Sequence, residues 1–433
     1  MKFIATGDTI VTCPYTTDYE GYRELVDFIR SADVRMNNME CPLSVGESPV
    51  SAFSGRPWMR GEPKLLDDLA EFGFNCYSFA NNHSLDYFYD GLLSTLSAFE
   101  ERGLPYAGAG RSLTEATRHC RTVTPNGTLA MVAVFSTNDT IALSAQAGDP
   151  KGSILPRPGV NMLRHRIRFS VTREQMDRLR EIADAAKINS RLKNRLKLGS
   201  VKINEDTFPF GDMEFSVGEP GRTSEPNPYD MERLEAAVKA AVADADRTVV
   251  YLHSHESKGE SDAEPDFYAE TFARACIDWG ADAVVGSGTH QAKGVEFYKG
   301  KPIFYCMGNF FFRPFDMPEY PNEWYELYRM EKTLTPREAE QRRTKNGTIG
   351  LVTQRYCYRG LAPMIEWDDD GNLKTCAALA VGLGFDDAAE TRGFPRVANE
   401  EDTQALFEQM KLLCEPYGTK VTLKDGLMHF SAE

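Results

Sequence analysis

The chain has 433 residues, of which 42% are hydrophobic and 11% are aromatic. It is therefore long enough for one large two-sheet core with insertions, or for two domains. A formal net charge of -15 repels phosphate backbones, which argues against nucleic-acid binding. The apolar runs have the length of strands, so no membrane segment is predicted.

The nine cysteines are scattered singly, without any Cys-x-x-Cys pair. This pattern predicts neither a disulfide framework nor a structural zinc site, and it favours a reducing compartment. The first residues read as a strand and lack the features of a signal peptide. We therefore expect a cytoplasmic protein.

Up to about residue 135, short apolar runs alternate with amphipathic runs, which is typical of repeated β-α units. Apolar side chains between Tyr22 and Ile29 recur with helical spacing. Pro63 and Gly73 lie where a second helix would begin and end. The patterns predict strands at 2–6 and 33–37 and helices at 22–29, 63–72 and 90–102. These alternating elements favour the α/β fold class.

The stretch 138–228 is rich in Arg, Lys, Pro and Gly, and its one clear helical pattern lies at 173–187. We interpret this stretch as an insertion in the core domain, or as a cap over its site.

After the insertion, strand patterns again alternate with helix patterns. The patterns predict helices at 230–244 and 267–279, strands at 248–252 and 282–286, and a hairpin at 294–309. From about residue 348 we expect two or more strands, a helix at 402–413 and a short strand pair. The core domain is thus predicted to span 1–347, and 348–433 to be a β-rich C-terminal extension packed on the same core.

Polar residues follow most of the predicted strands, at the point where each strand ends. In open α/β sheets ligands bind outside the carboxyl ends of strands, so these side chains are expected to meet at one edge. The residues are Asp8, Glu40, Asn82, His83, His253 and His290. Carboxylate, amide and imidazole groups form a mixed N/O ligand set, which suits one or two divalent ions of Mn, Fe, Zn or Mg. Such ions neutralise charge and activate water in phosphoester hydrolysis.

Each of these residues also has a structural interpretation. Asp8 after a glycine fits a turn, Asn82 fits an Asx turn or a helix cap, and Glu40 fits a solvated loop. The shared placement at strand ends is what favours a site. A structural role is predicted for the histidines outside these loops, which are His119, His165 and His429.

Six blocks of sequence can be compared with known families. They are GD at 7–8, NMECPL at 38–43, SFANNHSLDY at 78–87, AGAG at 107–110, WGADAVVGSGTHQAKGVE at 279–296 and GKPIFYCMGNFFF at 300–312. Over about residues 3–312 the chain resembles the poly-gamma-glutamate capsule-synthesis (CapA) family, which is similar to calcineurin-like metallophosphoesterases. The resemblance implies a four-layer α/β/β/α sandwich of metallo-dependent phosphatase type, with the insertion and the C-terminal β-rich extension added to it.

The same resemblance implies roles for the polar residues. The implied metal ligands are Asp8, Glu40, Asn82, His253 and His290. Glu40 would bridge two ions, and His83 would act as an acid or stabilise the transition state.

The chain also departs from the metallophosphoesterase pattern. Ile10 stands where those enzymes carry a histidine two residues after the first aspartate, and Ser287 lies in a stretch that is richer in histidine in relatives. Replacement ligands are therefore expected nearby. The additional candidates are His255, Glu256 and Asn309.

Two functions of different kinds follow from these patterns. The first is a metal-dependent hydrolase of a phosphoester, or of a gamma-glutamyl or related amide bond. The second is a non-catalytic accessory protein that binds an anionic polymer or a synthase partner through a degenerate metal site. A module that binds a small anionic metabolite on the same fold is a third interpretation. Each of the three implies an anionic small molecule or polymer as the ligand, and none implies nucleic acid.

Overall fold

The computed structural model describes residues 1–46, 48–52, 54, 57–137, 145–202, 206–314 and 316–432. Its largest sheet has ten strands, in the order β21 (Thr419–Lys424), β22 (Leu427–Ala432), β19 (Leu373–Gly382), β18 (Arg359–Trp367), β1 (Lys2–Ile10), β2 (Val34–Met39), β3 (Cys76–Ser78) and β4 (Tyr106–Ala107), with β17 (Asn309–Phe312) beside β1 and β20 (Arg396–Val397) beside β19. Strands β1 to β4 and β17 run parallel, whereas β18 is antiparallel to β1.

A second sheet has six strands. Their order is β15 (Val295–Tyr298), β16 (Lys301–Phe304), β14 (Ala283–Gly288), β13 (Arg247–Ser254), β7 (Gly127–Ser136) and β6 (Cys120–Thr124). The four central strands are parallel, and β15 and β6 form antiparallel edges. The predicted hairpin at 294–309 is confirmed as β15 and β16, and its turn uses Lys299 and Gly300, both with positive φ.

Helices connect these strands. They are α1 (Tyr22–Arg30), α2 (Leu65–Leu69), α3 (Phe88–Glu101), α4 (Leu113–Thr117), α8 (Pro228–Asp244), α9 (Phe267–Asp278), α10 (Asn322–Leu327), α11 (Pro336–Arg343) and α12 (Glu400–Cys414). Short 3-10 turns are η1 (Ala70–Phe72), η2 (Leu351–Thr353), η3 (Arg355–Tyr358) and η4 (Glu415–Tyr417). The predicted helix at 63–72 is shorter than expected, because α2 tightens into η1 before Gly73 ends it with a left-handed φ of 70°.

The six-stranded sheet is buried on both faces. On β13, Val249 and Tyr251 belong to the core cluster that includes Met36 of β2. The alternate residues Val250 and Leu252 belong to a second cluster, with the apolar faces of α8 and α9. Because successive side chains of a strand point to opposite faces, this division places the large sheet on one side of β13 and two helices on the other. The chain is therefore an α/β protein with several mixed sheets.

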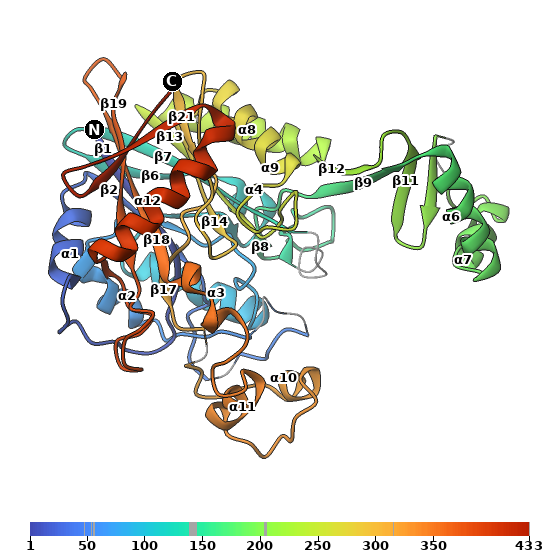
Figure 1. The fold of residues 1–433 in the computed structure, drawn as a ribbon, viewed down its shortest axis with the longest axis horizontal. Coiled ribbons are helices and arrows are strands. Elements are labelled where there is room, and N and C mark those ends of the chain that lie inside the picture. The colour runs from blue at the N-terminus through green and yellow to red at the C-terminus, as the bar shows by residue number, and fades with distance from the viewer. Residues whose placement is uncertain are drawn as a thin grey trace.

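The predicted insertion contains a four-stranded sheet that the sequence patterns did not reveal. Its order is β10 (Thr207–Phe210), β11 (Met213–Val217), β9 (His165–Val171) and β12 (Gly221–Pro226). Together with α6 (Arg173–Ala185) and α7 (Ser190–Lys197) it forms an arm that projects from the body (Figure 1). The predicted helix at 173–187 is confirmed as α6, whereas 138–144 lie outside the described residues.

Nearer its start, the insertion contains β8 (Gly159–Val160), which pairs with β5 (Ala109–Gly110) of the core domain in a two-stranded sheet.

The C-terminal segment belongs to the main sheet. Strand β18 pairs with β1, and β19 and β22 extend the sheet beyond it. The first strand of this segment begins at Arg359, later than predicted, because η2 and η3 come before it. Within the part of the chain that the structure describes, no helix has both the length and the apolar character needed to cross a membrane.

Candidate metal centre

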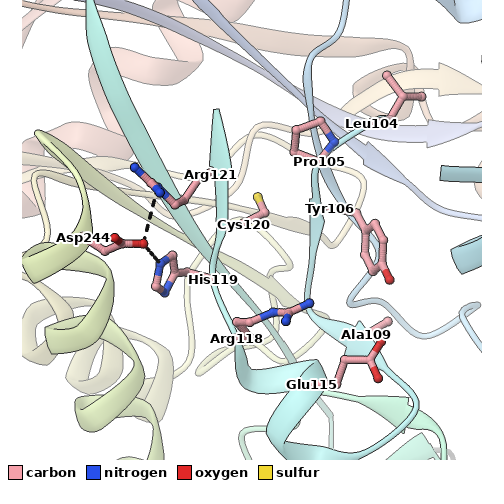
Figure 2. A pocket seen from close by; sticks show the side chains of 10 residues that line it. All are labelled: Leu104, Pro105, Tyr106, Ala109, Glu115, Arg118, His119, Cys120, Arg121 and Asp244. Carbon is pink, nitrogen blue, oxygen red and sulfur yellow. Dashed lines mark hydrogen bonds and ion pairs between the residues drawn. The ribbon is translucent and has the colours of Figure 1, made fainter. Parts of the chain in front are cut away.

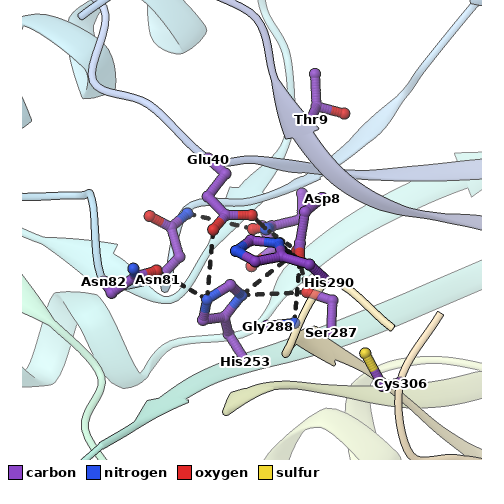
Figure 3. A network of polar contacts seen from close by, with 12 residues as sticks. Asp8, Thr9, Glu40, Asn81, Asn82, His253, Ser287, Gly288, His290 and Cys306 are labelled. Carbon is purple, nitrogen blue, oxygen red and sulfur yellow. Dashed lines mark hydrogen bonds and ion pairs between the residues drawn. The ribbon is translucent and has the colours of Figure 1, made fainter. Parts of the chain in front are cut away.

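The polar residues at the strand ends lie together where the two sheets meet (Figure 3). Asp8 lies on β1, and Glu40 and Asn82 follow β2 and β3. His253 lies near the end of β13, and His290 follows β14. Because the strands within each set are parallel, their carboxyl ends reach the same edge and bring these side chains into one cluster.

Asp8 is a fully buried carboxylate held by donors from both sheets. Its Oδ1 accepts hydrogen bonds from the Ser287 hydroxyl and from Asn38 Nδ2, the latter at 2.9 Å, and its Oδ2 accepts one from Gly288 N at 3.0 Å. Burial alone would raise the pKa of Asp8, but His253 and His290 outweigh it and hold the pKa well below its usual value. Asp8 is therefore ionised.

Glu40 is equally buried but lacks comparable donors. Among the described residues, no hydrogen-bond partner is found for its Oε1, and His253 Nε2 lies 3.7 Å from that oxygen. Burial, followed by the negative charge of Asp8, raises the pKa of Glu40 well above its usual value. A buried carboxylate oxygen without a donor is costly unless a cation compensates it, so Glu40 fits the role of a metal ligand.

Three atoms with lone pairs surround His253 Nε2. His253 Nε2 lies 2.9 Å from Asn82 Oδ1 and 3.1 Å from His255 Nε2, in addition to its approach to Glu40 Oε1. Burial lowers the pKa of both imidazoles, which favours the neutral form that binds metals. A cation at this point would satisfy two imidazole nitrogens that otherwise compete for one proton.

The ligand-type atoms fall into two groups, in each of which they lie within 4.8 Å of one another. One group is Glu40, His253 and His255, and the other is Asp8, Glu40 and His290. Glu40 belongs to both, which fits a bridging carboxylate. A donor set of imidazole and carboxylate suits a divalent metal ion.

His290 is oriented by a neighbour on β17. Its backbone is left-handed, with φ of 58°, and its Nδ1 lies 2.8 Å from Asn309 Oδ1. Asn309 is fixed in turn by a hydrogen bond from its Nδ2 to the Cys357 carbonyl oxygen at 2.8 Å. Asn309 thus fixes the orientation of the His290 ring. A hydrogen-bond partner on the second ring nitrogen is typical of a metal-binding histidine.

His83 faces a cavity beside the cluster and is held from behind by Asp86. His83 Nδ1 lies 2.6 Å from Asp86 Oδ2, which also accepts a hydrogen bond from Met59 N at 2.8 Å. His83 and His290 both line the cavity, and so does Ile10. Because Nδ1 is engaged by a carboxylate, Nε2 is the ring nitrogen that His83 offers to a ligand.

Glu256, an additional candidate from the sequence, has other partners. Its Oε2 accepts a hydrogen bond from the Tyr268 hydroxyl at 2.9 Å and from the Ser254 hydroxyl at 3.4 Å. Sequence reasoning also missed Asn38 and Asp86, although both lie inside the quoted blocks NMECPL and SFANNHSLDY. Their signal was only their position next to the candidate ligands.

A larger cavity, of about 440 Å³, lies elsewhere and holds none of these residues (Figure 2). There His119 Nε2 lies 2.9 Å from Asp244 Oδ2, and Arg121 Nε lies 3.4 Å from the same oxygen. Asp244 thereby pairs with the guanidinium of Arg121 and contacts the imidazole of His119. The arrangement agrees with the structural role predicted for His119.

Comparison with known proteins shows the family. Residues 2–314 match the model of the family described as Bacterial capsule synthesis protein PGA_cap, and the chain belongs to this family. The family is the one that the sequence blocks resemble.

Three relatives show how far the similarity extends. The uncharacterized protein y4sH of Sinorhizobium fredii is 29% identical over 438 residues, covering 98% of this chain and 92% of the relative. The capsule biosynthesis protein CapA of Bacillus anthracis is 24% identical over 299 residues, covering 69% of this chain and 54% of the relative. A probable polyglutamine synthesis accessory protein of Mycobacterium tuberculosis is 25% identical over 255 residues, covering 58% of this chain and 48% of the relative. The chain thus spans about half the length of the last two proteins.

Proposed function

We propose that the protein is a metal-dependent hydrolase that cleaves a phosphoester, or a gamma-glutamyl or related amide bond, in an anionic small molecule or polymer. The observation that carries the proposal is the convergence of Glu40, Asn82, His253 and His255 on one point, with the ionised Asp8 beside it. A buried, donor-poor carboxylate next to neutral imidazoles is costly without a cation.

The fold supports the proposal in a second way. Two sheets packed on each other, with helices α8 and α9 on the outer face of one, are compatible with the four-layer α/β/β/α sandwich of metallo-dependent phosphatases. We propose that the chain has this layer order.

The residues proposed to hold one or two ions of Mn, Fe, Zn or Mg are Asp8, Glu40, Asn82, His253, His255 and His290. A bound divalent ion would supply charge neutralisation and an activated water. Ser287, Asn38 and Gly288 N orient Asp8 through their hydrogen bonds, so that this carboxylate needs no rearrangement when a cation binds.

His83 is proposed to carry the proton of the reaction. In hydrolysis, an oxygen from water bonds to the reacting centre, the bond to the leaving group breaks, and the leaving atom takes a proton. Asp86 Oδ2 lies 2.6 Å from His83 Nδ1 and orients the ring, so that Nε2 is the nitrogen that would donate the proton to the leaving atom.

The accessory role is the second candidate, and one feature of the cluster favours it. Ile10 and Ser287 replace ligands that metallophosphoesterases carry, and the Ser287 hydroxyl already occupies Asp8 Oδ1. The relative from Mycobacterium tuberculosis carries the name of an accessory protein. In this role the chain would bind an anionic polymer or a synthase partner in poly-gamma-glutamate synthesis. The nine free thiols, eight of them buried, support a reducing, cytoplasmic setting for either role.

Metal content and hydrolysis of a generic phosphoester by two variants test the hydrolase. We expect His83→Ala to keep its metal and lose about 10²- to 10⁴-fold in turnover. We expect His290→Ala to lose metal and turnover together, because its side chain belongs to one of the two ligand groups. His429→Ala, on strand β22, is the matched control and should resemble the parent. Equal metal and equal turnover in all the proteins would refute the hydrolase and favour the accessory role.

A further inference from the structure

A cavity of about 180 Å³ adjoins the metal-ligand cluster and shares its walls. His83, His290 and Ile10 are among the residues that line it. The ring of Phe312 continues the wall, with its centroid 5.7 Å from that of His290. A molecule bound in this cavity would therefore be in reach of both the proton carried by His83 and the cluster behind His290.

Part of the cavity wall is built from aromatic rings that are held in place. Trp324 and Tyr328 of the α10 region line it. Trp324 is only 1% exposed and stacks on Tyr320, with centroids 4.3 Å apart and planes 3° from parallel. Its ring also lies 4.8 Å from that of Tyr328. Such preformed aromatic walls bind flat apolar groups at a low cost in conformational entropy.

The cavity offers little to a polyanion. Among the described residues that line it, the charged pair is Glu340 and Arg343, apart from the histidines. Arg343 Nε lies 2.9 and 3.1 Å from the two carboxylate oxygens of Glu340, and its guanidinium lies over the Tyr328 ring at 5.5 Å. The one guanidinium is thus neutralised within the cavity wall. Recognition of a row of carboxylates needs several cationic groups along a groove, which these walls do not provide.

The volume sets the size of the occupant. An engineered apolar cavity of about 150 Å³ binds one benzene molecule, so about 180 Å³ accommodates one six-membered ring and little more. We infer that this cavity binds the organic part of the substrate, and that this part is a single aromatic or similarly flat apolar ring joined to a phosphate or another small anionic group. The inference deepens the proposed hydrolase and relies on it only for the cleavage step.

Cleavage of such an ester balances with the groups present. Water adds its oxygen to phosphorus, the bond from phosphorus to the ring oxygen breaks, and His83 Nε2–H protonates that oxygen. The proton that water loses then restores the proton on His83. The products are inorganic phosphate and a phenol-like alcohol that leaves through the aromatic cavity.

Binding of two probes that differ only in the ring tests the cavity. Phenylphosphonate and methylphosphonate carry the same anionic group and resist hydrolysis. We expect calorimetry on the full chain to show phenylphosphonate binding at least about tenfold tighter, equivalent to about 1.4 kcal/mol. Tyr328→Ala and Trp324→Ala should remove most of this preference. The matched controls, Tyr229→Ala on the exposed face of α8 and Trp279→Ala after α9, should keep it.

The two variants protect the test against a folding defect, because Trp324 is buried and Tyr328 is only partly so. Equal binding of the two phosphonates by the parent, or tighter binding of an oligo-gamma-glutamate at the same site, would overturn the inference. Hydrolysis is measured separately. Tighter binding of phenylphosphonate without any phosphoester hydrolysis would refute the proposed hydrolase and leave the cavity assignment standing. Hydrolysis without this preference for the ring would refute the cavity assignment and leave the hydrolase standing.

Discussion

Replacing Asp86 by asparagine tests whether His83 delivers a proton. Asp86 is fully buried, and asparagine keeps its size and its acceptor for Met59 N. The change removes the negative charge 2.6 Å from His83 Nδ1. A hydrogen bond to a charged group contributes about 1.5–3 kcal/mol, so the contact between residue 86 and His83 loses roughly that much. If proton delivery limits turnover, the rate should fall about 10- to 150-fold.

The assay compares two esters that share a ring and differ in their leaving group. Phenyl phosphate needs a proton on its leaving oxygen, whereas 4-nitrophenyl phosphate needs little help. We therefore expect the full loss with phenyl phosphate and a much smaller loss with the nitrophenyl ester, at unchanged metal content. Asp90→Asn, at an exposed position of α3, is the matched control. An equal loss with both esters would show that the Asp86 and His83 pair does not act on the leaving group.

Two further predictions concern stability. A Cβ on Gly7 would overlap the carbonyl oxygen of Gly308, so Gly7→Ala should lower the free energy of unfolding, measured by urea titration, by about 1–3 kcal/mol. Gly221→Ala is the control, because the surroundings of Gly221 are open. Similar urea midpoints for the two variants would contradict this prediction. Burial lowers the pKa of His165, which stacks on Tyr268 at 3.8 Å, so the unfolded chain binds a proton that the folded chain excludes. The free energy of unfolding should then fall as the pH drops through about 6.5, by up to about 1.4 kcal/mol for each unit by which the two pKa values differ. The fall should be less steep in His165→Phe. The same pH dependence in the variant and the parent would show that His165 is not its cause.

The family, the α/β class and most of the helices could be predicted from the sequence. Helical spacing of apolar residues marks an interior face directly, and α1, α6, α8 and α9 agree with it. The arm shows the limit of this reasoning. Its strands, such as β9 with Arg166 and Arg168, carry charged residues, and few of their side chains are buried, so no apolar alternation marks them. They are held by pairing with each other across long stretches of chain.

The position of the polar cluster at the strand ends could be predicted from the sequence, but the direction in which each side chain points was harder to predict. Parallel strands alone bring Asp8 and Glu40 to one edge. The choice between His255 and Glu256 depends on alternation along an extended chain, where every second side chain shares a side. His255 accordingly lies with His253, and Glu256 lies with Ser254 on the side of Tyr268. The hydrogen bond from Ser287 to Asp8 joins residues 279 positions apart, and no local pattern reports such a contact.

The pairing of β1 with β18 has a consequence for the order in which the protein can fold. The amino group of Met1 bonds to the Trp367 carbonyl oxygen at 3.0 Å across 366 positions of chain, at the head of this strand pair. At about 5–20 residues per second, a ribosome needs roughly 20–70 s to make that separation. Throughout this time Lys2, Phe3 and Ile4 of β1 have an open edge on the side of β18, whereas Asp8, Thr9 and Ile10 can pair with β17 as soon as that strand is made. The nascent chain therefore has to shield an apolar strand long before its neighbour exists, which makes the interval before β18 emerges the period of greatest exposure to aggregation and to chaperone capture.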